Sequence, residues 1–480
     1  MPALPLAGPS NYLRFLTADC ERTVNWMPVN IEGQGKGGQT RYLKQCPGLK
    51  AFGSAGTGPV TALVQARGIL YAAINGRLIR VASDATQIDV GAVDQFSYFT
   101  AVNNTQIAIA SKTAMRVYDL DDLSMSSVEL NFLGTSSLDV LDGYGILAQP
   151  GTTTFYITAN QDFTVIDALQ YASAEGSNGN ITSLIVKNRE IQILKEQNSE
   201  IWYDSGATDF PLTRNDGANI EAGSGAGRTL VKIGGVAYWL GKDASGGNVV
   251  FAMSGYAPQR VSNRALEEQL SEIDDVSDSY AFSYTDEGQS FIVLQVPGLQ
   301  TTWVYDVSAS MWHERAEYVN GVFQPWRATC HAYCYGKHFV GDASGQIYVM
   351  EHAWNMYGTD VMVRDRYTPT QASPTNQPQR FGMLQIECSV GEGVVDVSIV
   401  PSDPPYEVQT PRAAKLMLRY ANDGTNIEGK SWKYLSLGKI GELKTRCRAT
   451  MLGSARTRRW QIRVTDDIRC DVLDAIVNEV

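Results

Sequence analysis

Several groups of residues in this 480-residue chain have the types and spacings that catalysis or metal binding requires. Residues 33–38 read Gly-Gln-Gly-Lys-Gly-Gly, the letters of a dinucleotide-binding turn, but no apolar strand leads into them and no amphipathic helix follows. Cys330, Cys334 and His338 share one face of a predicted strand. His331 lies on the opposite face, and no second ligand pair stands elsewhere at zinc spacing. We therefore expect core thiols and exposed imidazoles instead of a metal.

Histidines and carboxylates provide two further patterns, neither of which is complete. All four histidines lie between His313 and His352, but no Gly-x-Ser-x-Gly turn accompanies them. Glycoside hydrolysis needs a pair of carboxyl groups. Candidates on and after one predicted helix are Glu267, Glu268, Glu272, Asp274 and Asp275. Because carboxylates on a polar helix face are usually solvated, the sequence predicts no enzyme, no catalytic residue, no cofactor and no metal site.

The elements that would position such groups are strands of a repeated β-unit. A hydrophobic residue followed by Tyr-Asp ends at Asp119, Asp204 and Asp306. A second phrase, Asp-Ala-Ser-Gly, begins at Asp243 and Asp342. The Tyr-Asp phrases lie 85 and 102 residues apart, roughly two propeller blades of about 40 to 50 residues each. Because an Asp that binds its own turn backbone marks the end of a strand, this repetition predicts an all-β fold built on a β-propeller.

Runs of strand-forming residues, separated by Gly, Asn and Asp, divide residues 60–358 into similar units. Asn75-Gly76 between two alternating runs predicts a tight hairpin. The units are expected at 60–90, 92–130, 131–179, 180–223, 224–275, 277–321 and 322–358, which gives six or seven blades. A helix with one apolar face is predicted at 263–275, in a loop between blades. Residues 286–291 resemble the Asp-box turn of sialidase-type propellers, which supports the fold and implies no activity.

The character of the sequence changes after Gly358. Residues 367–378 are rich in Pro, Thr and Gln, which hold a strand ladder poorly. Beyond them, alternating runs suit a β-sandwich, at 383–390, 394–400, 415–420, 446–451 and 459–464. We therefore expect three parts: an irregular N-terminal arm at 1–58, the β-propeller at 59–358 and a C-terminal β-sandwich-like domain at 359–480.

Charge separates the last two parts. Residues 359–480 carry 17 Lys and Arg against 15 Asp and Glu, whereas the first 358 residues carry 23 against 36. The stretch 430–469 is strongly basic, so it could dock on an acidic partner. The candidate docking residues are Arg456, Arg458 and Arg459, and a solvated strand face is the alternative interpretation of each.

Nothing in the sequence predicts export or membrane insertion. No stretch approaches the roughly 20 apolar residues of a membrane-spanning helix, and no basic region followed by an apolar run opens the chain. The seven cysteines are odd in number and scattered. We expect a soluble chain, made in the cytoplasm, whose thiols are mostly reduced.

Short phrases near both ends of the chain carry a more specific resemblance. Near the N-terminus they are Asn-Trp-Met-Pro-Val-Asn at 25–30, Cys-Pro-Gly-Leu at 46–49, Gly-Pro-Val at 58–60 and Leu-Tyr-Ala-Ala-Ile-Asn-Gly at 70–76. Near the C-terminus they are Leu-Gly-Lys-Ile-Gly at 437–441, Arg-Cys-Arg at 446–448, Leu-Gly-Ser-Ala-Arg at 452–456 and Arg-Val-Thr-Asp at 463–466. In this order they resemble the packaged-DNA stabilisation proteins of short-tailed bacteriophages, also called tail nozzle, tail hub or tail accessory proteins.

The resemblance implies a structural virion protein without catalytic residues. Such proteins form a homo-oligomeric, usually hexameric ring in the virion tail, assembled in the host cytoplasm. The ring extends the portal and adaptor, helps retain packaged DNA and forms part of the DNA ejection channel. Implied partners are the tail adaptor ring, a tailspike or fibre, a plug or needle protein, and double-stranded DNA that passes without sequence-specific binding. The alternative is a glycan-binding or glycan-cleaving propeller whose sugar-stacking residues would be Trp312, Trp326, Tyr333 and Tyr335.

Overall fold

The computed structural model describes residues 4–12, 20–31, 41–54, 56–130, 132, 134–243, 245–400 and 406–479. The dinucleotide-like segment at 33–38 lies outside the described residues. Within these ranges one α-helix, α1 (Arg264–Ser271), and one 3-10 turn, η2 (Gly227–Thr229), interrupt a succession of strands. The helix is shorter than predicted, and Asn263 caps it by accepting a hydrogen bond from the Leu266 N–H at 2.9 Å. No helix among the described residues is long and apolar enough to cross a bilayer.

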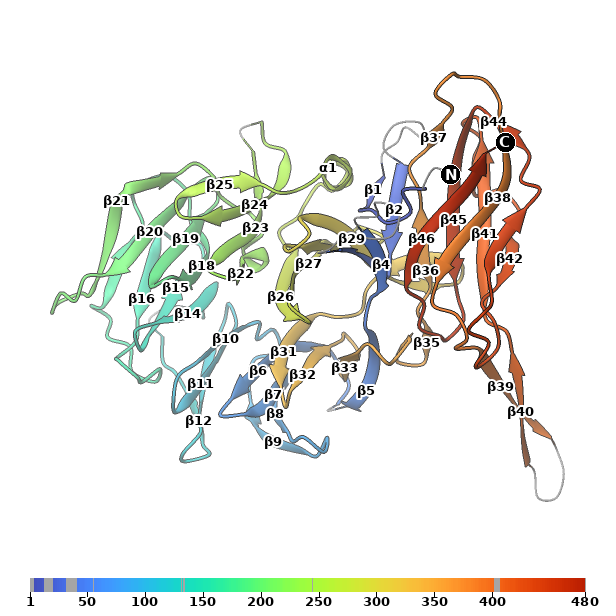
Figure 1. Cartoon of the computed structure of the whole chain (residues 1–480). Coiled ribbons are helices and arrows are strands. Elements are labelled where there is room, and N and C mark those ends of the chain that lie inside the picture. Colours follow the sequence, from blue (N-terminus) through green and yellow to red (C-terminus); the bar gives the residue numbers. More distant parts are fainter. Residues whose placement is uncertain are drawn as a thin grey trace.

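Seven antiparallel sheets form a β-propeller, and six of them use four consecutive strands each (Figure 1). Blade 1 consists of β6 (Val60–Ala66), β7 (Ile69–Ile74), β8 (Arg77–Val81) and β9 (Gln87–Ala92). Blade 2 consists of β10 (Phe99–Val102), β11 (Gln106–Ala110), β12 (Met115–Asp119) and β13 (Met125–Ser127). Blade 3 consists of β14 (Ser137–Leu141), β15 (Tyr144–Ala148), β16 (Thr154–Ile157) and β17 (Tyr171–Ser173). Blade 4 consists of β18 (Ile181–Lys187), β19 (Glu190–Lys195), β20 (Ser199–Asp204) and β21 (Leu212–Ile220). Blade 5 consists of β22 (Val231–Ile233), β23 (Val236–Lys242), β24 (Asn248–Ser254) and β25 (Ala257–Arg260). Blade 6 consists of β26 (Tyr280–Asp286), β27 (Gln289–Gln295), β28 (Thr302–Asp306) and β29 (Met311–Val319). The predicted fold class is confirmed, with seven blades.

The seventh blade closes the ring with a strand from the other end of the chain. Three of its strands are β31 (Cys330–Cys334), β32 (Lys337–Gly341) and β33 (Gln346–Glu351). The fourth is β5 (Gly48–Ser54), which runs antiparallel to β33 with Leu49 opposite Met350. The expectation of an irregular arm at 1–58 is therefore wrong for Gly48–Ser54 and for the other described strands of that range. A strand whose partner lies at the far end of the propeller leaves no hairpin signal in the local sequence.

The repeated Asp residues do close their own turns, as predicted. Asp119, Asp204 and Asp306 end the third strands of blades 2, 4 and 6. Each accepts a backbone N–H from two or three residues later, at 2.8 to 3.0 Å. Asp243 and Asp342 follow the second strands of blades 5 and 7 and accept the N–H two residues on, at 2.9 and 2.8 Å. Each phrase therefore marks its own corner of the blade, one at the end of the third strand and the other at the end of the second.

Asp286 behaves differently from the Asp of an Asp-box. It ends β26 before a two-residue turn in which Glu287 and Gly288 both have positive φ, +48° and +79°. Its carboxylate lies 2.8 Å from His352 Nε2, and among the described residues it accepts no hydrogen bond from its own turn. The Asp-box interpretation is therefore wrong, although the segment does form a blade hairpin.

The C-terminal body is a β-sandwich, and both of its sheets take strands from the N-terminus (Figure 1). One sheet consists of β2 (Cys20–Val24), β36 (Arg364–Tyr367), β45 (Thr457–Val464), β41 (Lys415–Asn422) and β42 (Lys433–Ser436). The other consists of β3 (Trp26–Asn30), β4 (Arg41–Gln45), β46 (Val472–Glu479), β38 (Gln379–Cys388) and β43 (Cys447–Thr450). Trp26, Phe381 and Trp460 are buried in the apolar core between them. The N-terminal segment is thus an integral part of this body.

Shorter strands complete the sheets. They are β1 (Asn11–Tyr12), β30 (Val322–Pro325), β34 (Met356–Tyr357), β35 (Asp360–Val361), β37 (Gln371–Ala372) and β44 (Ser454–Ala455). β39 (Val394–Val400) and β40 (Tyr406–Arg412) form a two-stranded sheet of their own, which projects from the C-terminal body at the lower right of Figure 1.

The propeller and the sandwich share one continuous sheet. β2 lies beside β29 of blade 6, with Val24 opposite Glu314 in parallel, and pairs with β36 on its other side. The path from β26 through β29 and β2 to β42 therefore crosses both bodies without a break. Because backbone hydrogen bonds join them, the two bodies should move as one unit.

Asn25 is the residue at which the chain leaves this sheet for the other, and every polar atom of its side chain is bonded. It is buried, with a φ of +59°. Its amide donates to the carbonyls of Ala316 at 2.8 Å and Val363 at 2.7 Å. Its Oδ1 accepts from the Ala316 N–H at 3.1 Å and the Tyr357 hydroxyl at 2.8 Å. One side chain thus joins the propeller strand β29 to the entry of β36 and to β34.

Two ion pairs lie at this junction, one between the two bodies and one within the sandwich. Arg22 of β2 donates to Glu314 of β29 through Nε at 3.0 Å and Nη2 at 2.6 Å. Asp365 of β36 is fully buried and accepts from Gln461 Nε2 at 2.8 Å and Arg463 Nε at 2.9 Å. Burial opposes the charge of Arg463, but the Asp365 carboxylate outweighs it, so the pKa of Arg463 is raised. The junction is therefore held by ion pairs as well as by the sheet.

Candidate functional site

A cavity of about 330 Å³ is lined by all seven blades at the centre of the propeller. Its wall is formed by the innermost strands and the turns before them: Thr61, Ala62, Leu63, Tyr98, Phe99, Thr100, Ser137, Leu138, Asp139, Ser183, Leu184, Ile185, Gly227, Arg228, Leu230, Lys232, Tyr280, Ala281, Phe282, Thr329, Cys330 and His331. Residues far apart in sequence converge here only because the ring closes. Such a concave site with a few polar groups is where a propeller can hold a ligand.

Arg228 provides an unpaired positive charge in this central cavity. The turn η2 places it between blades 4 and 5, with its guanidinium carbon 3.5 Å from the centre of the Tyr98 ring and 5.1 Å from that of Tyr280. No carboxylate in the part of the chain that the structure describes lies within ion-pair distance of it, and Asp278 acts on it only from farther away. Burial lowers the pKa of Arg228, as expected for a cation removed from water without a direct counter-ion.

The other ionisable groups of the central cavity carry no net charge. Lys232 Nζ lies 3.2 Å from Asp139 Oδ2, so these two charges neutralise each other. Burial raises the pKa of Cys330 to about 11 and that of Tyr280 to about 12, so both side chains stay protonated and neutral at pH 7. The cavity therefore has one excess positive charge, at Arg228.

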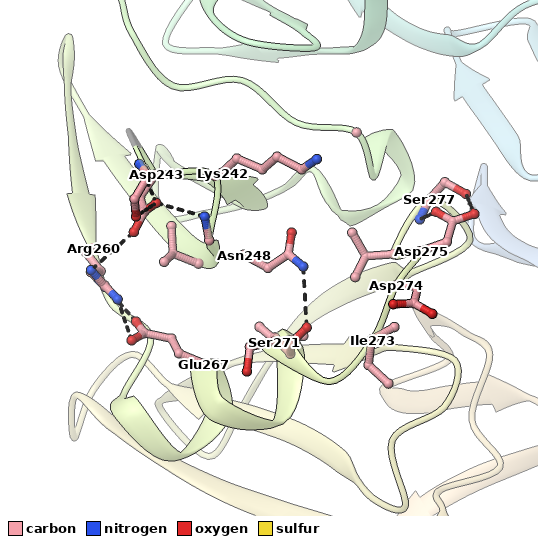
Figure 2. A pocket seen from close by; sticks show the side chains of 17 residues that line it. Lys242, Asp243, Asn248, Arg260, Glu267, Ser271, Ile273, Asp274, Asp275 and Ser277 are labelled. Carbon is pink, nitrogen blue, oxygen red and sulfur yellow. Dashed lines mark hydrogen bonds and ion pairs between the residues drawn. The ribbon is translucent and has the colours of Figure 1, made fainter.

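A second hollow, of about 580 Å³, lies between α1 and the turn after β23 (Figure 2). Asp243 and Glu267 both turn toward Arg260 on one side of it, with Arg260 Nε 2.6 Å from Glu267 and Nη1 3.8 Å from Asp243. Asp274 and Asp275 lie on the opposite side, where Asp275 accepts a hydrogen bond from its own turn. Three of these carboxylates are thus engaged in bonds that shape the turn, the helix start and the loop.

The remaining two candidate carboxylates, Glu268 and Glu272, line a different cavity, of about 390 Å³, beside Tyr12 and Arg22. The structure therefore does not bring the five predicted carboxylates together. A hydrolytic pair would need two carboxyl groups facing one substrate bond, and the helix instead distributes its acidic residues over two hollows.

Three histidines form a chain with Asp286 between blades 6 and 7. His331 Nε2 lies 3.0 Å from His338 Nδ1, and His338 Nε2 lies 3.7 Å from Asp286 Oδ1. His352 contacts the other oxygen of Asp286, and this bond lowers the pKa of that carboxyl. Burial, reinforced by His338, lowers the pKa of His331 to about 3.

The prediction of exposed imidazoles is wrong for His331 and His338, which are partly covered, whereas Cys334 is a buried thiol as predicted. The described residues contain no group of three ligands suited to a metal ion.

His313 should make the stability of the protein depend on pH. It is fully buried beside Arg315, no described residue bonds either ring nitrogen, and burial lowers its pKa well below 6.5. The unfolded chain therefore binds this proton first, so stability is complete above pH 6.5 and falls as the pH drops below it. At pH 5 the loss should be about 2 kcal/mol for this residue. Urea unfolding at pH 7.5 and pH 5 should show this loss, and His313→Phe should reduce it; an unchanged pH dependence in that variant would contradict the assignment.

Of the three predicted docking arginines, only Arg456 is exposed. Arg458 is fully buried, with its guanidinium carbon 4.0 Å from the ring centre of Phe381 and 4.3 Å from that of Tyr420. Burial lowers its pKa to about 10. Arg459 is 5% exposed. The docking prediction is therefore wrong for Arg458 and Arg459, because β45 alternates between two faces that are both covered.

This basic surface also contains exposed apolar side chains, which were not predicted from the sequence. The loop between β42 and β43 exposes Ile440 and Leu443, at 58% and 74%. Lys439, Lys444 and Arg446 of the same loop are also exposed. Two large apolar side chains in a basic run, without strand alternation, were the available signal. We call these five residues the basic loop.

The residues proposed for sugar stacking are mostly unavailable. Trp312 and Trp326 are buried in the blades. Tyr335 donates its hydroxyl proton to the Val81 carbonyl at 2.8 Å and is partly covered. Only Tyr333 among the four is exposed, so the structure gives the glycan interpretation no aromatic platform from this set.

Solved structures that resemble the chain are distant. The designed Ika8 protein has a TM-score of 0.38 at 13% identity, covering 63% of this chain and 99% of its own. The WD40 β-propeller domain of Doa1 has a TM-score of 0.41 at 12% identity, covering 63% and 97%. The extracellular domain of the putative one component system BT4673 from B. thetaiotaomicron has a TM-score of 0.45 at 10% identity, covering 88% and 58%. No curated protein sequence matches the chain significantly.

The family comparison is more specific. Residues 21–355 match the phage stabilisation family, described as bacteriophage P22 Gp10, β-propeller. The match begins within β2 and ends just after β33, so it contains all seven blades and most of β2, the strand that pairs with the propeller. The chain therefore belongs to the phage DNA-stabilisation family and is a structural protein of the phage particle.

Proposed function

We propose that this chain is a subunit of the tail nozzle ring, which extends the portal and adaptor of a short-tailed phage, helps retain packaged DNA and forms part of the ejection channel. The family match across residues 21–355 carries the proposal. The continuous sheet between propeller and sandwich supports it, because a subunit that holds DNA under pressure needs bodies that do not hinge apart.

The proposed ring is hexameric, and its subunits meet through repeated head-to-tail surfaces that close by rotation. Its proposed partners are the adaptor ring on one side, and a tailspike or fibre and a plug or needle protein on the other. We also propose that residues 59–358 and 359–480 act as two functional units, linked through the N-terminal strands. Double-stranded DNA passes without base-specific contacts.

The charges of these two units support different roles for them, one beside the DNA and the other against the adaptor. Residues 59–358 carry 17 Lys and Arg against 33 Asp and Glu. DNA carries about one negative charge per 1.7 Å of axis, so an acidic wall repels it and lets it slide. The basic loop and Arg456 would instead face an acidic adaptor.

Reversing the charges of Lys439, Lys444 and Arg446 together should reduce incorporation of the chain into particles about tenfold. Three lost surface ion pairs contribute about 0.2 to 1 kcal/mol each, and a difference of 1.4 kcal/mol is a factor of ten. The matched control reverses three exposed charges of the propeller: Lys112, Arg189 and Lys337. Incorporation is measured by quantitative immunoblotting of purified particles at two salt concentrations; equal incorporation of the two variants would contradict docking through the basic loop.

Cryo-electron microscopy of particles that carry a labelled copy of this chain tests the proposal as a whole. The expected result is label density in a symmetric ring below the portal. Particles with unlabelled tails, and the labelled protein free in the extract, would overturn it. The same maps would show which unit faces the DNA.

A further inference from the structure

We propose that the central cavity of the propeller binds a compact oxyanion, such as inorganic phosphate or a phosphate monoester, through the guanidinium of Arg228. The proposal concerns a site on the propeller axis and is independent of the ring assembly. It rests on three features: the stacking of Arg228, the absence of a direct counter-ion, and the neutrality of the remaining wall.

The stacking leaves the donors of Arg228 available. A guanidinium carbon 3.5 Å from the centre of the Tyr98 ring lies in face contact with that ring. Face contact uses the π-surface of the group and not its in-plane N–H bonds. No hydrogen bond from these N–H groups occurs among the described residues, so up to five donors remain for a ligand with two adjacent oxygens.

The surroundings favour an anion over a cation. Asp139, the carboxylate of the wall, already contacts Lys232 at 3.2 Å. It also accepts the Val186 N–H at 2.7 Å, so it is not free to compensate Arg228. Tyr280 keeps its hydroxyl proton and can donate it. Because the site is partly desolvated, the lower local dielectric strengthens the attraction between this one excess positive charge and an anion.

The size of the site limits the ligand. A cavity of about 330 Å³ holds a phosphate group and a few waters, or a small phosphate monoester. A volume of about 330 Å³ is too small for a DNA duplex, whose major groove alone is about 12 Å wide. The proposed ligand is therefore a small anion and not the packaged genome.

Isothermal titration calorimetry of the purified chain with sodium phosphate, at constant ionic strength set with sodium chloride, tests the proposal. Saturable binding is expected, and Arg228→Gln should weaken it at least tenfold. Arg228→Lys keeps the charge but loses the planar fork, so it should weaken binding several-fold. Arg189→Gln, at an exposed arginine of blade 4, is the matched control and should bind as the unmodified chain does.

A second probe, deoxycytidine monophosphate, separates the two sources of phosphate. Binding of both probes supports a phosphate monoester as ligand, and binding of inorganic phosphate alone supports the free ion. Phosphorus NMR line broadening, lost in Arg228→Gln, is the independent readout. If that variant does not fold, as judged by its melting curve in chloride buffer, Arg228→Lys and Tyr280→Phe take its place. Equal binding by these variants and the unmodified chain, or no saturable binding of either probe, would overturn the proposal.

Discussion

Replacing Asn25 with Ala is expected to lower the free energy of unfolding by about 5 kcal/mol. The substitution leaves four buried polar groups without a hydrogen-bond partner, and each such group costs about 1 to 3 kcal/mol. Those groups are the N–H and C=O of Ala316, the carbonyl of Val363 and the hydroxyl of Tyr357. They belong to the propeller and to the entry of the sandwich, so both bodies should lose stability together. Urea unfolding followed by tryptophan fluorescence measures the change.

The control for this substitution is Asn320→Ala, in the exposed turn between β29 and β30. Asn320 has a similar backbone conformation, with a φ of +51°, but lies at the surface. It isolates the strain of placing Ala in the left-handed region, about 1 kcal/mol. If Asn25→Ala destabilised the chain no more than this control, the bridging role of the Asn25 side chain would be refuted.

Asp365→Ala is expected to cost about 3 to 5 kcal/mol, the usual penalty for removing one partner of a buried ion pair. Asp365 is fully buried and bonds both Gln461 and Arg463. Its loss leaves the Arg463 guanidinium covered by aromatic rings, 5.1 Å from the ring centre of Tyr318 and 5.2 Å from that of Trp432, without its carboxylate.

A double-mutant cycle with Arg463→Met gives this prediction a sharper test. Removing both charges abolishes the uncompensated cation, so the double variant should be more stable than the sum of the two single losses predicts. A coupling free energy near zero would mean that the pair does not stabilise the junction. Because Arg463 also stacks on aromatic rings, Met at that position keeps part of the apolar contact.

The blades were predictable because their signals are local. Asn75-Gly76 does join β7 to β8, and both residues have positive φ, as a tight hairpin between alternating strands requires. The Asp residues at 119, 204 and 306 act within a few residues of their own position. The residues that interact in these turns are close together in the sequence, so the sequence alone predicts them.

The ring closure and the junction were not predictable, because they pair residues from opposite ends of the chain. β5 has its partner in β33, and β2 lies between β29 and β36. The burial of Arg458 was not predicted for a different reason. A run of basic residues favoured a solvated or docking surface, but Arg458 shares strand parity with Trp460 and Ile462 and so faces the core.

The central site had no signal in the local sequence. Arg228 stands in an ordinary inter-blade turn, and Tyr98 and Tyr280 come from blades on either side of it in the chain. Only the closed ring brings the three together. The four histidines are clustered in the sequence, but only the strand register places His331 and His338 on one side of Asp286.

The position of β5 also dictates an order of events during synthesis. The strand emerges from the ribosome early, yet its partner β33 ends at Glu351. About 300 further residues must be added first, which takes on the order of 15 to 60 s at about 5 to 20 residues per second. Until then the nascent propeller remains an open arc with an unpaired edge, a template for pairing with the wrong strand. Newly made chains are therefore most vulnerable to aggregation and proteolysis in the interval before the last blade is translated.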